Sequence, residues 1–237
     1  MTPSNPHWLA LDLSGSATSW ALGRMENNRP QQIFKQTIGH STNHSEAVIS
    51  TLIQLFEKSH LSLNAVEKLL VTSGPGSYTG LRVALSTLKA FSLSRQFPIV
   101  TLSSHEAKVL AYAEKVAWEL PYDHIYCVSN LSMNRYVSAH YRVRDRQKIQ
   151  FVRDSVITGL NDFEDAESAL ILTEDETLAF LIPKEDGVTI EACPFEASFL
   201  LTAYEKSAGK REYQSLEEVI SLTPTYYGES FKPPVKK

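Results

Sequence analysis

One segment constrains the fold of this chain more than any other: Lys68-Leu69-Leu70-Val71-Thr72-Ser73-Gly74-Pro75-Gly76-Ser77-Tyr78-Thr79-Gly80-Leu81-Arg82-Val83. It begins with a short apolar run that ends in a turn, which is typical of a buried strand. Three glycines and a proline follow within seven residues; glycine permits positive φ values and close backbone approach, and Pro75 fixes one φ. Residues 81–96 contain neither glycine nor proline. The pattern predicts a strand, a glycine-rich turn and a helix.

A glycine-rich turn before a helix can bind an anion, because its N–H groups and the helix dipole favour negative charge. The two best-known phosphate loops do not match, since Leu81 and Arg82 stand where a Walker loop has Lys and Ser or Thr. The third glycine also falls one residue late for the dinucleotide fingerprint. A structural turn and an anion-binding turn both remain open. The residues concerned are Gly74, Gly76, Ser77, Thr79, Gly80 and Arg82.

The residues of this turn carry a family resemblance. Residues 73–83, Ser-Gly-Pro-Gly-Ser-Tyr-Thr-Gly-Leu-Arg-Val, closely resemble the hallmark segment of the TsaB (YeaZ) family. Members of that family are partner subunits in bacterial tRNA threonylcarbamoyladenosine synthesis. The resemblance is strong over residues 9–104 and weaker beyond. Ser129-Asn130-Leu131 stands where TsaB sequences usually have Asp-Ala-Arg, and Gly228 replaces the arginine of the closing Pro-x-Tyr-Leu-Arg.

The order of predicted elements indicates an α/β fold with mixed sheets. Its first half reads as three short strands in an antiparallel meander and then helices that alternate with strands, and its second half repeats this order in outline. The resemblance implies two tandem actin-like domains, as in the superfamily of sugar kinases and heat-shock ATPases. We expect an N-terminal domain at residues 1–120, with the glycine-rich turn and the partner helices, and a divergent C-terminal domain at 121–237, whose last helix either stays there or packs back on the first domain. The predicted strands are 8–14, 19–24, 32–38, 68–73, 98–104, 124–129, 135–143, 150–156, 169–173 and 188–192, and the predicted helices are 45–59, 81–96, 105–119 and 195–207.

In helix 45–59 the apolar residues spread over a broader arc than one sheet contact requires, and in helix 81–96 the face opposite the apolar one holds small or apolar rather than charged residues. A helix that is weakly polar all round is buried on two sides. The second side of each helix is buried either by another part of this chain or by another protein. In the TsaB family the two corresponding helices form the face that pairs with the catalytic subunit or with a second TsaB. We therefore predict a partner interface made by Ile49, Ile53, Phe56, Val83, Thr87, Ala90 and Ser94.

Asp12 ends the first predicted strand and precedes a small-polar hairpin. This arrangement resembles the first phosphate loop of the actin-like superfamily, with Asp12 and Ser14 as its candidate residues. The alternative is an aspartate that forms a turn by bonding to nearby N–H groups. Both interpretations stay open at this point.

Composition excludes several classes of protein. The net charge of −4 argues against a stand-alone nucleic-acid binder, which would need a basic face for phosphates. His40 and His44 lie four residues apart, but His40 falls in the loop before the helix and no third ligand sits at a suitable spacing, so no metal site is predicted. The two cysteines, Cys127 and Cys193, are far apart and are expected to be reduced in a cytoplasmic protein. Residues 1–7 are polar, and no signal peptide, membrane span or nucleophile motif is evident.

The resemblance implies a non-catalytic subunit that binds and activates a TsaD-type threonylcarbamoyltransferase. Further expected partners are a TsaE-type ATPase, a second copy of this chain through the same helices, and tRNA, contacted mainly through the complex. No tightly bound cofactor is expected in this subunit, and ATP would bind in the complex or at its interface. The alternative is a stand-alone nucleotide-binding ATPase or phosphotransferase of the actin-like superfamily that uses Asp12 and residues 73–80.

Overall fold

The computed structural model describes residues 7–26, 29–39, 44–132, 135–145, 148–158, 163, 168–174, 176–182 and 187–227. The chain forms two compact units. Unit 1 comprises Met1–Glu119 and Pro194–Pro224, and unit 2 comprises Leu120–Cys193 and Thr225–Lys237. Residues 194–224, which the sequence assigns to the second domain, thus belong to unit 1, and they include the last predicted helix.

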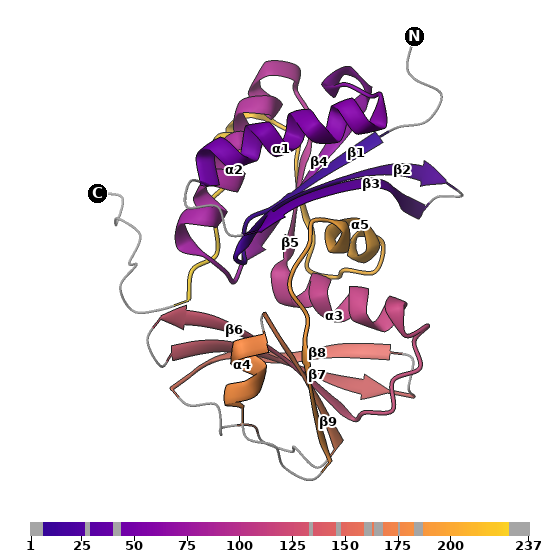
Figure 1. The fold of residues 1–237 in the computed structure, drawn as a ribbon, viewed down its shortest axis with the longest axis vertical. Helices are drawn as coiled ribbons and strands as arrows, with labels where there is room; N and C mark the ends of the chain where they lie inside the picture. Colours follow the sequence, from indigo (N-terminus) through magenta and orange to yellow (C-terminus); the bar gives the residue numbers. More distant parts are fainter. Residues whose placement is uncertain are drawn as a thin grey trace. The chain divides into compact units, whose positions relative to one another are not determined.

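Unit 1 is built around a mixed sheet of six strands in the order β11-β5-β4-β1-β2-β3 (Figure 1). The first three strands pair antiparallel, which confirms the predicted meander, and β4 and β5 add parallel to β1 and to β4. The elements of unit 1 are β1 (His7–Asp12), β2 (Ala17–Glu26), β3 (Arg29–Gly39), α1 (His44–Ser59), the 3₁₀ turn η1 (Leu63–Ala65), β4 (Val66–Gly74), α2 (Tyr78–Arg95), β5 (Ile99–Ser103), α3 (Ser104–Lys115), α5 (Ser198–Tyr204), β11 (Arg211–Tyr213) and α6 (Leu216–Ser221).

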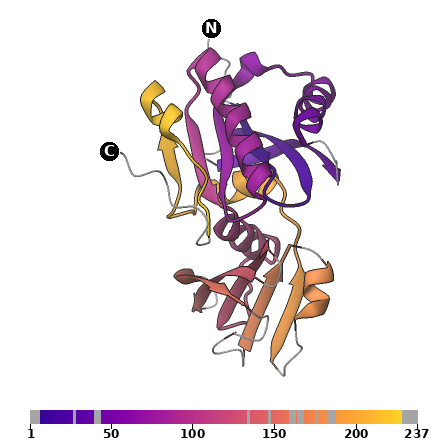
Figure 2. The same cartoon turned by 90° about the vertical axis from the view of Figure 1, so that its left-hand side faces the viewer.

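Alternation along the strands of unit 1 supplies two hydrophobic cores, one on each face of the sheet. On one face, Leu9 and Leu11 of β1 pack with α1, α2 and α6. On the other face, Trp8 and Ala10 of the same strand pack with α3 and α5. Figure 2 shows α2 lying along the sheet and α1 beside it. The sheet is therefore covered by two helical layers, and each layer receives every second side chain of the central strands.

Unit 2 holds a second mixed sheet, of five strands in the order β10-β9-β6-β7-β8. Its first three strands again pair antiparallel and its last two add parallel, so the strand plan of unit 1 recurs as the sequence predicts. A core that includes Tyr126, Tyr136 and Ile171 lies under α4. The elements of unit 2 are β6 (His124–Ser132), β7 (Arg135–Arg144), β8 (Lys148–Ile157), β9 (Ala169–Thr173), α4 (Glu176–Leu181) and β10 (Val188–Ala192).

The α/β class with two mixed sheets is confirmed, but four short elements were not predicted. These are η1, α4, β11 and α6, of three, six, three and six residues. A three-residue strand has no readable alternation, and a helix of under two turns has no readable period. The helix expected at 195–207 is also shorter than predicted, since α5 spans Ser198–Tyr204.

Candidate functional site

The glycine-rich turn lies directly against the hairpin between β1 and β2. A Cβ atom on Gly76 would lie 2.6 Å from the carbonyl oxygen of Ser14, and a Cβ on Gly80 would collide with the carbonyl oxygen of Leu13. Gly74 has a φ of 113°, a conformation that other residues rarely adopt. The glycines are thus required by the close approach of two backbone segments of this chain.

Two N–H groups of the turn are already bonded within the chain. Ser77 donates its N–H to the carbonyl oxygen of Ser14 at 2.6 Å. Gly80 donates its N–H to the Ser77 hydroxyl at 3.1 Å, so Ser77, rather than Thr79, caps α2. Arg82 lies further along α2 and donates from Nη1 to the Tyr78 hydroxyl at 2.7 Å. These contacts support the structural interpretation of the turn, and anion binding stays a prediction.

Asp12 lies in the interior at the end of β1, and only 1% of its surface is exposed. Its Oδ1 accepts from the Ser14 N–H at 3.1 Å and from the Thr72 hydroxyl at 2.7 Å. Its Oδ2 is buried without a hydrogen-bond partner among the described residues. Asp12 therefore ties the ends of β1 and β4 together and forms a turn with Ser14, which supports the turn interpretation, and the phosphate loop stays a prediction.

Two basic side chains are buried close to Asp12 on α3. His105 and Lys108 are each 1% exposed. Burial raises the pKa of Asp12 above its ordinary value, while the hydrogen bonds from Thr72 and Ser14 and the charge of Lys108 oppose that rise. Burial lowers the pKa of His105 well below its ordinary value, and the charge of Lys108 lowers it further. These groups form an internal polar cluster beneath α3.

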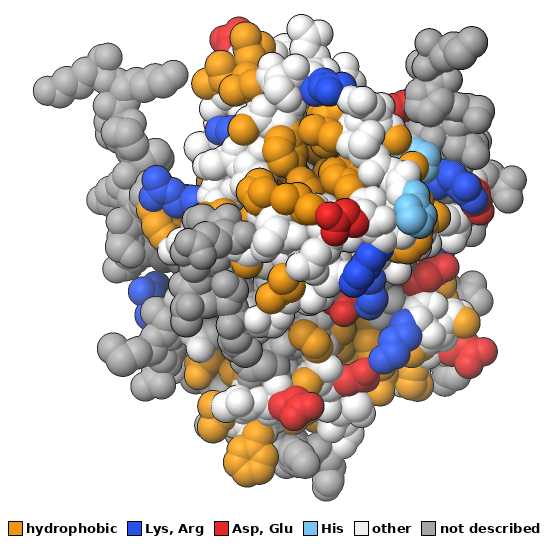
Figure 3. Space-filling view, turned by 45° about the horizontal axis from the view of Figure 1, so that its top comes forward, with side chains coloured by type: hydrophobic (Ala, Val, Ile, Leu, Met, Phe, Trp, Pro, Cys, Tyr) orange, Lys and Arg blue, Asp and Glu red, His pale blue; other side chains and the backbone are white. Residues whose placement is uncertain are grey.

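The outer faces of α1 and α2 form the largest apolar surface that the sequence singles out. Ile49 and Ile53 on α1 are 46% and 52% exposed, and Leu93 on α2 is 50% exposed. Figure 3 shows hydrophobic side chains gathered over the helices of unit 1. All seven residues predicted for a partner interface are exposed or half-buried: Ile49, Ile53, Phe56, Val83, Thr87, Ala90 and Ser94.

The hydroxyl groups on this face do not need an outside partner. Thr87 donates to the carbonyl oxygen of Val83 at 2.8 Å, and Ser94 donates to that of Phe91 at 2.9 Å. Because these hydroxyl groups bond to the preceding helical turn, the methyl group of Thr87 and the methylene group of Ser94 face outward. A hollow of about 300 Å³, lined by Arg82, Val83, Ser86 and Thr87, adds relief to α2. The face can therefore accept a closely packed helix with little desolvation cost.

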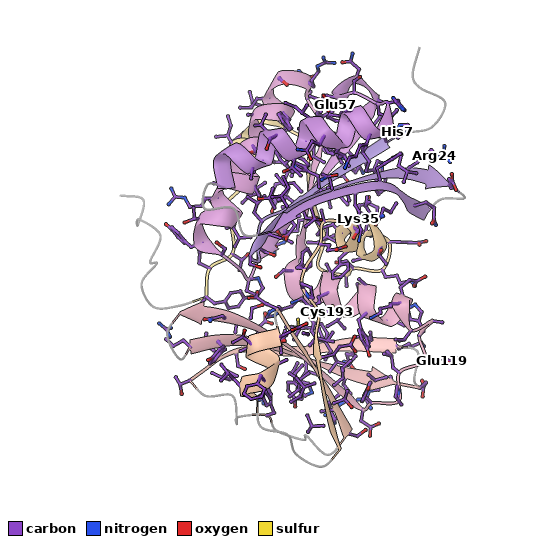
Figure 4. All side chains as sticks on the ribbon, in the orientation of Figure 1. His7, Arg24, Lys35, Glu57, Glu119 and Cys193 are labelled. Atoms are coloured by element: carbon purple, nitrogen blue, oxygen red, sulfur yellow. The ribbon has the colours of Figure 1, made fainter. Side chains whose placement is uncertain are left out.

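Charged side chains also lie on these two helices, since Glu57 and Lys58 of α1 and Arg82 and Arg95 of α2 are exposed. Lys35 projects from β3 (Figure 4), and its Nζ lies 2.6 Å from Oε2 of Glu196. In the described part of the chain, no three His, Cys, Asp or Glu residues gather to hold a metal ion. Cys127 is buried and Cys193 is half-buried. His40 and Gly228 lie outside the described residues, as does the side chain of His44. No helix in the described ranges is long and apolar enough to cross a bilayer.

Leu216 and Ile220, on α6, are exposed apolar residues that the sequence reasoning did not include. A signal was present. Ser215 and Glu218 form a capping box, in which the Ser215 hydroxyl accepts from the Glu218 N–H and the Glu218 carboxylate accepts from the Ser215 N–H. The Ser-x-x-Glu pattern would have placed a helix start there.

Comparisons with known proteins agree with the geometry. Residues 36–158, just over half of the chain, match the TsaD family, described as tRNA N6-adenosine threonylcarbamoyltransferase. The chain is 32% identical over 109 residues to the tRNA threonylcarbamoyladenosine biosynthesis protein TsaB of Buchnera aphidicola, a match that covers 46% of this chain and 45% of that protein. It is 37% identical over 84 residues to the tRNA N6-adenosine threonylcarbamoyltransferase of Syntrophus aciditrophicus, covering 35% of this chain and 25% of that enzyme.

In sequence, these matches thus span less than half the length of the curated relatives. In structure, the similarity extends over almost the whole chain. YeaZ from Pseudomonas aeruginosa superposes with a TM-score of 0.70, covering 94% of this chain and 100% of that protein, at 16% sequence identity. At that identity the superposition shows a shared fold.

Proposed function

This chain belongs to the TsaD family, and among the proteins of that family it resembles TsaB (YeaZ). We therefore propose that it is a non-catalytic subunit in tRNA threonylcarbamoyladenosine biosynthesis. It binds a TsaD-type threonylcarbamoyltransferase through the outer faces of α1 and α2 and activates it. The observation that carries this proposal is the apolar face of these two helices, with Ile49, Ile53 and Leu93 about half exposed. Side chains of this kind are enriched where a partner covers them.

The buried residues of unit 1 favour a non-catalytic role for this chain over a catalytic one. Asp12 is held by Thr72 and Ser14 inside the fold. The backbone at Leu13 and Ser14 occupies the space beside Gly76 and Gly80 of the turn. A phosphotransferase that used these residues would need them open to a nucleotide. Their contacts instead favour a scaffold that fixes α2 in place.

Activation would follow from differential binding. A partner that binds one arrangement of the catalytic subunit more tightly than another shifts its population toward that arrangement. A TsaE-type ATPase, ATP at the complex and tRNA contacted mainly through the other subunits complete the proposed assembly. Self-association through the same helices and a cytoplasmic location remain predictions.

The test is light scattering after size-exclusion chromatography, with titration calorimetry, on this chain and the TsaD-type subunit of the same organism. We expect a discrete complex that displaces any self-dimer. Ala90→Arg should weaken binding by at least about 100-fold, because a long charged side chain cannot sit where two helices meet closely. Ala90 is exposed, so the melting temperature should not change.

Two controls accompany this variant. Ala90→Ser keeps the side chain small and should retain binding. Thr189→Arg adds the same charge at an exposed position on β10 and should also bind as the unchanged chain does. Unchanged binding by Ala90→Arg would contradict the proposed interface. No complex under any nucleotide condition would contradict the proposed function, and ATP turnover by the isolated chain would then be measured.

A further inference from the structure

The short helix α6 is fixed against the C-terminal half of α2. Val219 and Leu222 are buried in the core that α1 and α2 share with the sheet. Lys89 of α2 donates from Nζ to the carbonyl oxygen of Ile220 at 2.9 Å. Burial lowers the pKa of Lys89, in keeping with its position between the two helices. The relation between α2 and α6 is therefore rigid.

A groove of about 640 Å³ runs between these two helices. Leu93 and Leu216 line it, and Ile220 lies beside it; the last two are 62% and 60% exposed. None of the residues that line it is charged. Its hydroxyl groups are already bonded within the chain, since Ser92 donates to the carbonyl oxygen of Phe97 at 2.6 Å and Ser215 caps α6. The groove thus combines the apolar side chains of Leu93, Pro98, Leu216 and Val219 with uncharged polar ones, which include Gln96 and Gln214.

The groove is continuous with the partner face proposed above, because Leu93 belongs to both. A stable interface buries about 800 Å² and 20–30 residues on each partner. The seven residues predicted on α1 and α2 are too few to supply that area. The footprint of a partner must extend beyond them, and the exposed apolar side chains next to α2 are those of the groove.

From this we infer that the TsaD-type partner extends past the C-terminal end of α2 and inserts an apolar side chain into the groove between α2 and α6. This inference rests on the proposed function, and it adds Leu93, Leu216 and Ile220 to the contact surface. The occupant is an uncharged segment whose apolar side chain contacts Leu93 and Leu216, because no charged group lines the groove to hold an ionic one. Leu216 and Ile220 then act as determinants of affinity at the edge of the interface.

The test uses Leu216→Asp in the calorimetric titration with the TsaD-type subunit. Leu216 is the first residue of α6, where an acidic side chain suits the helix dipole, so the fold should be retained. The affinity should fall at least about tenfold, because a carboxylate would be desolvated in an apolar contact. Phe180→Asp, at an exposed apolar side chain on α4 in unit 2, is the matched control and should bind as the unchanged chain does. Ile220→Ser provides a second variant should Leu216→Asp unfold.

The outcomes separate this inference from the proposed function. Loss of binding by Ala90→Arg with full binding by Leu216→Asp and Ile220→Ser would overturn the groove inference and leave the proposed function standing. Unchanged binding by all three variants would overturn both the groove inference and the proposed interface on α1 and α2, whereas the proposed function itself fails only if no complex forms. A change in self-association alone, with partner binding intact, would assign the groove to a second copy of this chain and overturn the inference.

Discussion

The two helical layers of unit 1 cover opposite faces of one sheet, but they differ in how far the sides that face away from the sheet are buried. In the layer of α3 and α5, nine of the twelve residues of α3 are buried, and Ala107 and Leu110 share a core with Leu200 and Leu201 of α5. In the layer of α1 and α2, the inner faces are buried, whereas Ile49, Ile53 and Leu93 stay about half exposed in the described part of the chain.

This difference shows why composition alone does not reveal an interface. Both layers contain helices with small and apolar residues on more than one side. For α3 the second cover includes α5, which arrives from residues 198–204, far along the chain. For α1 and α2 the described residues supply only α6, beside the C-terminal half of α2, and Ile49, Ile53 and Leu93 stay about half exposed. The uncovered layer is therefore where we place the partner, and the following variants test that contrast.

The largest effect should come from moving α2 itself. In Gly80→Ala, the added Cβ would collide with the carbonyl oxygen of Leu13, a backbone atom that cannot rotate away. We expect a loss of about 4 kcal/mol or more in the free energy of unfolding, measured by urea titration. Gly15→Ala is the matched control, because a Cβ there meets nothing within 4 Å. Equal stability of the two variants would contradict the close seating of α2.

A smaller effect should separate the two layers directly. Leu200→Ala on α5 removes a fully buried side chain and should cost about 3 kcal/mol in unfolding free energy. Ile53→Ala on α1 removes an exposed one and should change stability by no more than about 0.5 kcal/mol, while it weakens binding of the TsaD-type subunit. If Ile53→Ala proved as destabilising as Leu200→Ala, the outer face of α1 would be buried within this chain. The proposed difference between the two helical layers would then be wrong.

The smallest effect should be the pH dependence of stability that comes from His105, on α3 in the covered layer. The pKa of His105 is lower in the folded than in the unfolded state, so the unfolded chain binds the proton first as the pH falls below about 6.5. This linkage should lower the free energy of unfolding as the pH falls from 7 to 5. His105→Gln cannot take up that proton, so its urea-derived unfolding free energy should fall less over the same range. An identical fall in both chains would show that His105 does not carry this linkage.

Much of the fold was predictable from particular patterns. The turn at residues 74–80 predicted a strand and a helix on either side, and β4 and α2 are there. On α2, Leu81, Ala84, Leu85 and Leu88 recur at helical spacing in the sequence, and all four are buried. By contrast, β11 forms because Arg211–Tyr213 meets the edge of β5, a pairing of residues more than 100 apart that no local pattern encodes.

The candidate site was predictable only in part. The sequence identified α1 and α2 as unusual, but exposure depends on which other elements cover them, and α5 covers α3 instead. The burial of Asp12 was not predictable from its neighbours in sequence, because one of its hydrogen bonds comes from Thr72, sixty residues away. The groove was not predicted, since it needs α6 to be placed beside α2.

The measurement that tests this account most directly is amide hydrogen exchange of the chain, free and in complex with the TsaD-type subunit. The account predicts slower exchange in peptides from residues 44–59, 78–95 and 214–221, and no change in peptides from α3, α5 and unit 2. A mixture made with Ala90→Arg should show none of this protection. Protection confined to other parts of the chain, with the peptides of α1 and α2 unchanged, would contradict the claim that the uncovered layer is the partner surface.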